Sequence, residues 1–191
     1  MLTASNPLKR LPSTHIALPH AAERVVLPGG HLVFIRSAEA SDDPAIAEFL
    51  SGLLRSSRAF RLFASAGEQR DLAKTPTAHA GVDQSGLLAQ TEDGRVVGHG
   101  IYVRLYGARA EVAVEVAGDY RPLGLATLLL ARLAQIAEQH TISHFIVDVL
   151  PADLDRLALY CDSFDASAEQ IGGLVALKLR TADWRQVRAD R

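Results

Sequence analysis

The sequence predicts an α/β protein whose sheet is mostly antiparallel but also contains a strand–helix–strand unit. Runs of β-favouring residues separated by turn residues occupy residues 25–36 and 87–116, and such runs indicate antiparallel hairpins. Residues 109–150 then follow the order strand, turn, helix, strand, and a connection through a helix is typical of parallel strands. A further helix and strand follow, so we expect a sheet of mixed direction.

Composition places the chain among ordinary globular proteins. Its 191 residues favour one domain, with 48% hydrophobic and 22% charged residues and a net charge of −2. This balance argues against a nucleic-acid surface, which normally carries a basic stripe. The single cysteine excludes an intrachain disulfide, and no Cys/His spacing predicts a metal site. No apolar run reaches membrane-spanning length and the first residues do not form a signal peptide, so we expect a cytoplasmic protein without membrane contact.

The first third of the chain predicts an arm, a hairpin and a helix. Residues 1–22 contain three prolines and little apolar periodicity, which indicates an extended arm. Residues 25–27 and 31–36 flank a Pro-Gly-Gly turn and predict a hairpin. Ser-Asp-Asp-Pro at 41–44 combines a capping residue, an acidic first turn and an early proline, so a helix should begin there. Its apolar face would contain Ile46, Phe49, Leu50, Leu53 and Leu54.

A less regular region follows that helix. We expect a second short helix over 57–64, with Arg55, Arg58 and Arg61 along it as a solvated face or, alternatively, a ligand contact. Residues 65–85 predict a long irregular loop. Such loops in compact domains are often functional, so this one is either part of an acceptor site or a variable surface loop.

Three strands form the predicted meander. Residues 87–91 and 95–105 flank a Glu-Asp-Gly turn, and the third strand covers 109–116. Alternation places Glu111, Ala113 and Glu115 on one face of that strand, and the valines between them on the other.

The third strand leads through a small-residue turn into a long helix. The helical period ending at His140 is carried by Ala126, Leu129, Leu130, Leu133, Ile136 and Ala137. A turn of this kind directs free backbone N–H groups and the positive end of the helix dipole outward, which suits a phosphate.

The C-terminal part should contain two strands and a helix. Residues 145–150 are nearly all apolar and predict a strand buried on both faces. Asp153 would cap a helix running to about residue 162, and 172–180 would form the last strand. The tail after it is charged, and Trp184 is the residue that would fix it to the domain.

The turn and five other blocks resemble a known family. Arg121-Pro-Leu-Gly124-Leu-Ala126 resembles the Arg/Gln-x-x-Gly-x-Gly/Ala pyrophosphate motif of the GNAT acyltransferase superfamily. The remaining blocks are similar, in order and spacing, to protein lysine acetyltransferase domains of the kind fused to acyl-CoA synthetases or cyclic-nucleotide-binding domains. These blocks are residues 27–36, 57–63, 94–104, 110–114 and 148–151. The resemblance implies a single GNAT domain over 23–182, with an N-terminal arm at 1–22 and a tail at 183–191.

The resemblance also implies a co-substrate and a set of residues that bind it. Acetyl-CoA would donate the acyl group, with no metal involved. Its pyrophosphate and pantetheine arm would lie along the third strand, the turn and the start of the long helix. The residues assigned to this binding are Val114, Val116, Arg121, Leu123, Gly124, Leu125, Ala126, Thr127 and Asp153.

Three residues are candidates for the chemistry. Glu111 corresponds to the glutamate of the family's Ala-Glu-x-Ala sequence, which takes the amine proton directly or through water. Otherwise it is a solvent-facing carboxylate or pairs with Arg104 or Arg109. Glu115 shares its face and is the reserve base, since two nearby carboxylates raise the pKa of one when both are partly buried. Tyr160 resembles the tyrosine that approaches the CoA sulfur as a general acid, and the alternative is a packing role in an amphipathic helix.

Some residues depart from the family pattern. Pro122 removes one N–H donor, Leu123 stands where a cation is common, and Asp153 where asparagine is common. We therefore expect transfer of acetyl from acetyl-CoA to an amine, with a protein lysine, such as one on an acyl-CoA synthetase, ahead of a small-molecule amine. A catalytically weakened acyl-CoA-binding regulatory module is the alternative, and a homodimer is compatible with either.

Overall fold

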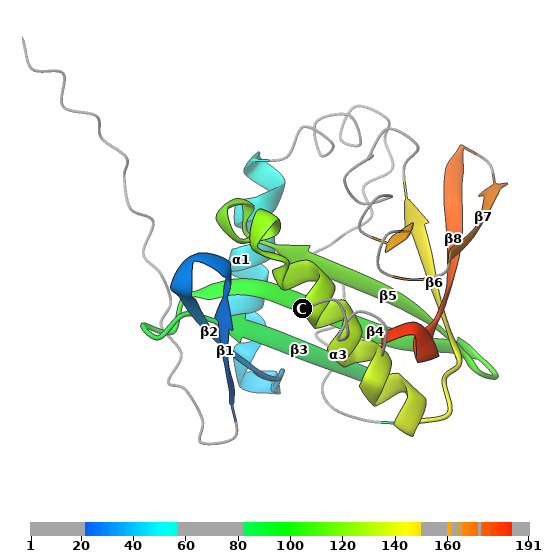
Figure 1. Ribbon diagram of the computed structural model, residues 1–191, viewed down its shortest axis with the longest axis horizontal. Coiled ribbons are helices and arrows are strands. Elements are labelled where there is room, and N and C mark those ends of the chain that lie inside the picture. Colours follow the sequence, from blue (N-terminus) through cyan, green and yellow to red (C-terminus); the bar gives the residue numbers. More distant parts are fainter. Residues whose placement is uncertain are drawn as a thin grey trace, which may run out of the picture.

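The computed structural model describes residues 22–56, 82–149, 160–161, 164, 166–171 and 173–184 (Figure 1). Its strands are β1 (Glu23–Leu27), β2 (His31–Ser37), β3 (Gln84–Gln90), β4 (Val96–Tyr106), β5 (Arg109–Val116), β6 (His144–Val149), β7 (Ala166–Ile171) and β8 (Leu174–Arg180). They form one eight-stranded sheet in the order β1-β2-β3-β4-β5-β6-β8-β7. All neighbouring pairs are antiparallel except β5 and β6, which are parallel, so the predicted mixed sheet is confirmed.

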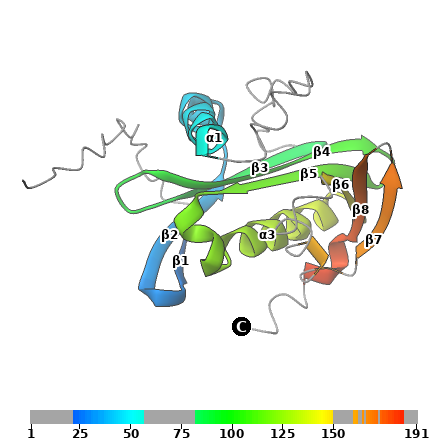
Figure 2. The ribbon, with the colours of Figure 1, turned by 90° about the horizontal axis from the view of Figure 1, so that it is seen from above.

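Two helices lie on opposite faces of the central strands. Figure 2 shows α1 (Asp43–Ser56) on one side of β3, β4 and β5, and α3 (Leu125–Gln139) on the other. Among the described helices, none is long and apolar enough to cross a membrane.

Glycines on β4 allow α3 to approach the sheet closely. A Cβ atom at Gly100 would lie 2.9 Å from Cδ1 of Leu133, and one at Gly98 would lie 3.0 Å from Cδ1 of Leu129. Both leucines are fully buried in the main hydrophobic core, together with the inward valines of β5. The helix therefore packs on backbone rather than on side chains at these two points.

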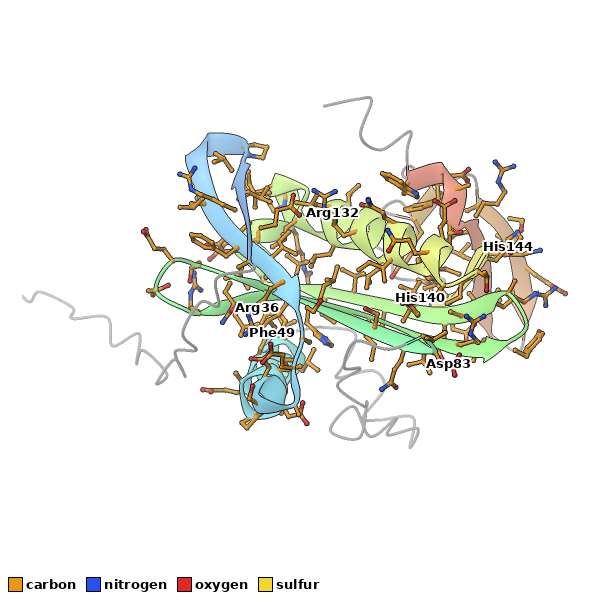
Figure 3. The ribbon with its side chains drawn as sticks, turned by 90° about the horizontal axis from the view of Figure 1, so that it is seen from below. Arg36, Phe49, Asp83, Arg132, His140 and His144 are labelled. Carbon is orange, nitrogen blue, oxygen red and sulfur yellow. The ribbon has the colours of Figure 1, made fainter. Side chains whose placement is uncertain are left out.

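A second, smaller core lies under α1, and a buried ion pair fixes the start of that helix. Arg36 donates to both carboxylate oxygens of Asp42, at 2.5 and 2.7 Å, and to Gln90 at 3.0 Å. The Glu39 backbone N–H also donates to Asp42 at 2.8 Å. Figure 3 shows Arg36 and Phe49 together between the sheet and α1. The network ties the end of β2 and the edge of β3 to the helix start.

The parallel pair β5 and β6 is the irregular part of the sheet. The two strands pair at three positions, from Arg109 opposite His144 to Glu111 opposite Ile146. Beyond these positions, β5 continues to Val116 and β6 continues to Val149, but the two strands no longer pair with each other. The backbone edge of residues 112–116 that faces β6 is therefore open to another extended chain in the part of the molecule that is described.

Several predictions about the elements need correction. The strand expected at 87–91 already begins at Gln84, and β7 was not predicted. The prediction that the strand after α3 is buried on both faces is wrong, because Asp148 is exposed and Ile146 is half-buried. The predicted tail contact is confirmed, since the Trp184 indole donates to Glu138 at 2.6 Å. The arm, the helix at 57–64, most of the irregular loop and nearly all of the helix after Asp153 lie outside the described residues.

Candidate active site

The turn after β5 is held from both sides of the sheet. The Ala117 N–H donates to the Val97 carbonyl at 2.9 Å, and the Tyr120 N–H donates to the Ala117 carbonyl at 2.9 Å. The Tyr120 side chain is buried, with His31 edge-on to its ring and the Arg95 guanidinium 5.9 Å from its centre. This anchoring places the 3-10 helix η4 (Gly118–Leu123) and fixes where α3 begins.

Gly124 makes the change of direction between the turn and α3. It adopts the left-handed conformation, with φ 75° and ψ 15°, which glycine reaches without steric penalty. Its carbonyl accepts from the Leu128 N–H at 3.1 Å and so closes the first turn of α3. No described group accepts a hydrogen bond from the N–H groups of Leu125, Ala126 or Thr127.

Those three N–H groups lie where the sequence predicts an anion-binding site. They lie at the positive end of a 15-residue helix whose first turn contains no acidic residue. Pro122 precedes all three, so its missing N–H is not one of them. Leu123 packs against the main core instead of facing outward, and Arg121 is exposed, with its Nε donating to the Val116 carbonyl at 3.3 Å.

The two valines assigned to co-substrate binding can contact a ligand through their backbone groups but not through their side chains. The side chains of Val114 and Val116 are buried in the core below α3. Their peptide groups lie on the part of β5 that β6 does not pair. Amide groups of an extended ligand can hydrogen-bond to such an edge as an added strand does.

Glu111 lies on the face of the sheet away from α3, and its side chain is exposed. Its neighbours across the strands are Val103 and Ile146. Neither arginine considered as a partner is bound to it. Arg104 donates to Asp83 at 2.8 Å and to the His140 carbonyl at 2.6 Å, and Arg109 donates to the Tyr106 hydroxyl at 2.9 Å. The Glu111 carboxylate is therefore accessible to an incoming group.

Glu115 has a neighbour that the sequence did not reveal. His99 lies directly opposite it in the ladder of β4 and β5. The histidine is 3% exposed, and its Nε2 has no hydrogen-bond partner among the residues that the structure describes. Burial lowers the pKa of His99 from 6.5 to about 4, so the ring is neutral at physiological pH. A lone histidine in an alternating strand carries no signal for this pairing, because the register of two strands decides it.

Tyr160 lies in the main core, 1% exposed, and its carbonyl accepts from the Phe164 N–H at 3.1 Å. Its neighbour Cys161 is exposed, which differs from the packing role that its type favours. Asp153 lies outside the described residues. The structure thus brings together β5, the turn and the start of α3, and places Glu111 and Glu115 on the opposite face of β5 from the valines.

Comparisons with known proteins identify the family and the fold of this chain. A model of the acetyltransferase (GNAT) family matches residues 54–162, more than half of the chain. A comparison with curated proteins gives no match.

The GNAT domain of S. lividans PAT is 23% identical, with a TM-score of 0.68 over 86% of this chain and 99% of that one. A cAMP-binding acyltransferase from Mycobacterium smegmatis is 19% identical, with a TM-score of 0.59, and matches 84% of this chain but 47% of its own length. A GNAT-family acetyltransferase from Staphylococcus aureus is 14% identical, with a TM-score of 0.62 over 78% and 99% of the two chains. At these identities the structures establish the shared fold.

Proposed function

This chain belongs to the acetyltransferase (GNAT) family, and from that premise we propose that it transfers acetyl from acetyl-CoA directly to an amine, with a protein lysine as the acceptor. The observation that carries the proposal is the continuity between the open edge of β5 and the unpartnered N–H groups of Leu125, Ala126 and Thr127. One stretch of chain thus offers a hydrogen-bonding edge for an amide-containing arm and a positive helix end for a pyrophosphate.

The co-substrate would bind along that stretch. The pantetheine amides would pair with the peptide groups of residues 112–116, as an added strand would. The pyrophosphate oxygens would accept from the first N–H groups of α3, where the helix dipole favours negative charge. The left-handed turn at Gly124 aims these donors, and the buried side chain of Tyr120 holds the turn in place.

Glu111 would act on the acceptor amine. A lysine has a reference pKa of about 10.4 and is almost wholly protonated at neutral pH, so it must lose a proton before it attacks. The carboxylate of Glu111 would accept this proton directly or through one water. The free amine then adds to the thioester carbon, the carbon–sulfur bond breaks, and the thiolate takes a proton from a donor, for which Tyr160 is proposed. The nitrogen gives up one proton as the amide forms, and that proton restores the donor. Glu115, opposite the neutral His99, is the reserve base.

An alternative function follows from Pro122 and Leu123. With no N–H at Pro122 and with leucine in place of a second cation beside Arg121, the domain would bind acyl-CoA as a regulatory signal and transfer the acyl group slowly or not at all. A small-molecule amine as the acceptor is the alternative within the enzyme class. The three candidate functions differ in the affinity for CoA that they require and in the substrate that receives the acetyl group.

Two measurements on the intact chain separate these functions. Calorimetry measures binding of CoA, and thiol release from acetyl-CoA measures turnover with lysine-containing proteins and with small amines. Turnover that is faster with proteins supports the proposal. CoA binding without thiol release for any amine supports the regulatory module, and absence of CoA binding contradicts both.

A further inference from the structure

Basic side chains form a row across the sheet, close to Glu111. The strand register places Arg109 opposite His144 on β6, and His144 opposite Arg180 on β8. The adjacent row contains Glu111, Ile146 and Lys178 in the same order. We call Arg109, His144 and Arg180, together with Lys178 from the adjacent row, the basic row.

The basic row lies on the same face as Glu111. Ala110, Phe145 and Leu179, which pair with one another between the two rows, are fully buried in the core. Because successive side chains of a strand point to opposite faces, the residues on either side of them point away from that core. Figure 3 shows His144 at the end of the sheet, beyond the C-terminal end of α3.

The charges in this row act on one another. The pKa of His144 lies below its usual value, first through partial burial and then through the positive charges of Lys178, Arg109 and Arg180, with Asp183 opposing them. Arg109 and Arg180 are exposed. The carboxylates on or near this face are Glu111, Asp148, Glu169, Asp183, Asp83 and Glu138. Asp183 is bound to Arg180 at 3.1 Å, Asp83 to Arg104 at 2.8 Å, and Glu138 to Trp184 at 2.6 Å. By the strand register, Glu111 and Asp183 are the carboxylates beside Arg109, Lys178 and Arg180, whereas Asp148 and Glu169 lie farther along β6 and β7. Three cations and two carboxylates thus occupy the end of the face around Arg109, on a protein whose net charge is −2.

Large apolar side chains are exposed at the same end of the sheet. Of the four such residues in the described part of the chain, Val82, Leu105 and Tyr106 lie there, and they are 64%, 48% and 64% exposed. A hydrogen bond of 2.7 Å from the Arg104 N–H to the Asp83 carbonyl holds the two segments side by side. The Arg109 guanidinium stacks 5.3 Å from the centre of the Tyr106 ring. Exposed tyrosine and arginine beside apolar side chains are typical of protein–protein contacts.

A hollow lies at the end of the basic row. It has a volume of about 350 Å³, and His144 and Arg180 line it together with the hydroxyl-bearing Thr141 and Ser143. Glu138, also in the lining, is held by Trp184. The Thr141 hydroxyl donates to the His140 carbonyl, and the Ser143 hydroxyl contacts the Ala108 carbonyl and the His144 ring. The exposed Arg180 guanidinium is therefore the group at this hollow that suits a carboxylate.

The basic row lies close to Glu111, the proposed base, along β5. Arg109 and Glu111 are two residues apart on one strand, and two residues of a strand span roughly 6.5–7 Å. A carboxylate bound at the row would thus lie within about two residues of an amine at Glu111.

We propose that the basic row and its apolar rim dock an acidic protein surface, and that the acceptor lysine of that surface has carboxylates about two residues away. The inference rests on the proposed function, because it places the acceptor at Glu111. It narrows the acceptor to a protein with an acidic surface around its target lysine.

The test uses two fluorescent peptides with one central lysine, one with glutamate and the other with glutamine at the second position on each side. Anisotropy without acetyl-CoA gives binding, and mass spectrometry with acetyl-CoA gives acetylation. The variants are R109Q/R180Q and K178Q, and Arg24→Gln, an exposed arginine on β1 at the other end of the sheet, is the control.

We expect the intact chain and the control to bind the glutamate peptide more tightly, with a preference that falls as salt increases. Each charge removed from the basic row should reduce this preference about two- to fivefold, while CoA affinity is unchanged. Equal binding of both peptides, or an equal loss of both in R109Q/R180Q, overturns the inference.

The binding arm separates this inference from the proposed function. A charge-dependent preference without acetylation contradicts the proposed function and leaves the docking surface standing. Acetylation without any preference contradicts the docking surface alone. Faster acetylation of a small anionic amine than of either peptide overturns the assignment of a protein acceptor.

Discussion

Glu115 on β5 lies directly opposite the buried His99 on β4. The histidine is buried, and no group in the described part of the chain hydrogen-bonds to its Nε2, so the neutral ring is favoured over the charged one. Glu115 thus borders a neutral ring, whereas Glu111, two positions earlier on the same face, is exposed. The two carboxylates considered for catalysis lie in different surroundings.

His99 should make the protein less stable in mild acid. The unfolded chain binds a proton at this histidine near pH 6.5, but the folded chain excludes it down to about pH 4. The stabilisation from the neutral ring is therefore complete above pH 6.5 and is lost as the pH falls from 6.5 to 4. A shift of this size corresponds to about 3 kcal/mol. Urea unfolding of the intact chain and His99→Gln between these pH values measures it.

The comparison variant for that experiment is His31→Gln, since the His31 side chain is exposed. Its unfolding free energy should keep the pH dependence of the intact chain, whereas His99→Gln should lose most of it. An unchanged pH dependence in His99→Gln would show that His99 does not carry the effect.

A negative charge in the first turn of α3 should weaken CoA binding without weakening the fold. Thr127→Glu places a carboxylate beside the proposed pyrophosphate site, and the helix dipole stabilises such a residue by about 0.3–1 kcal/mol. We expect CoA affinity to fall at least about tenfold by calorimetry, since like charges at close range cost about 1.4 kcal/mol or more, while the melting temperature holds. Thr127→Gln is the neutral control, and equal CoA affinity of the two variants would place the pyrophosphate elsewhere.

Gly100→Ala should destabilise the protein, because the new Cβ meets Leu133 at 2.9 Å in a core without room for it. Overpacking of this kind typically lowers the free energy of unfolding by about 1–3 kcal/mol. Gly52→Ala in α1 is the matched control, since nothing lies within 4 Å of its new Cβ and alanine favours a helix by roughly 0.5–1 kcal/mol. Denaturant unfolding that ranks Gly100→Ala as the more stable of the two would contradict the close packing of α3 on β4.

Asp42→Asn should be among the most destabilising single changes under α1. Arg36 and Asp42 are 7% and 1% exposed, and removal of the carboxylate charge leaves the guanidinium buried without a counter-ion. Breaking one side of such a pair lowers stability by about 3–5 kcal/mol. Replacing both residues, as in Arg36→Met with Asp42→Leu, should recover part of this loss, and chemical unfolding measures the free energy of each variant. If the ion pair itself were the source of stability, the double variant would lose more stability than Asp42→Asn.

The parts of the fold with a clear period were predictable from the sequence. Strict alternation identified β5 at its observed bounds, and the three- and four-residue repeat of leucine and alanine identified α3 to within one residue of its end. β7 was not predicted, because Ala-Ser-Ala-Glu-Gln-Ile has little apolar alternation, and an exposed edge strand needs little. The one-sided burial of β6 depends on what covers it, and its composition does not contain that information.

The residues of the candidate site also divide into those that the sequence predicted and those that it did not. The turn, Gly124 and the start of α3 follow one another in the chain, so a local pattern indicated them. The pairs His99 with Glu115 and Arg109 with His144 depend on register between strands that are separated in sequence. The first ladder contains a register shift between Arg104 and Tyr106, the second follows the crossover through α3, and neither feature is readable from residue types alone.

The most direct test of the account is the effect of Glu111→Gln on acetyl transfer and on CoA binding. If Glu111 accepts the amine proton, the variant should reduce kcat/KM for the acceptor by about 10²–10⁴, the usual range for a lost general base. Calorimetry should give the same Kd for CoA, because the open edge of β5 and the start of α3 are intact, and Glu115→Gln should have a smaller effect. Turnover of Glu111→Gln within about threefold of the intact chain, a difference of about 0.6 kcal/mol in the barrier, would contradict the assignment of Glu111 as the base.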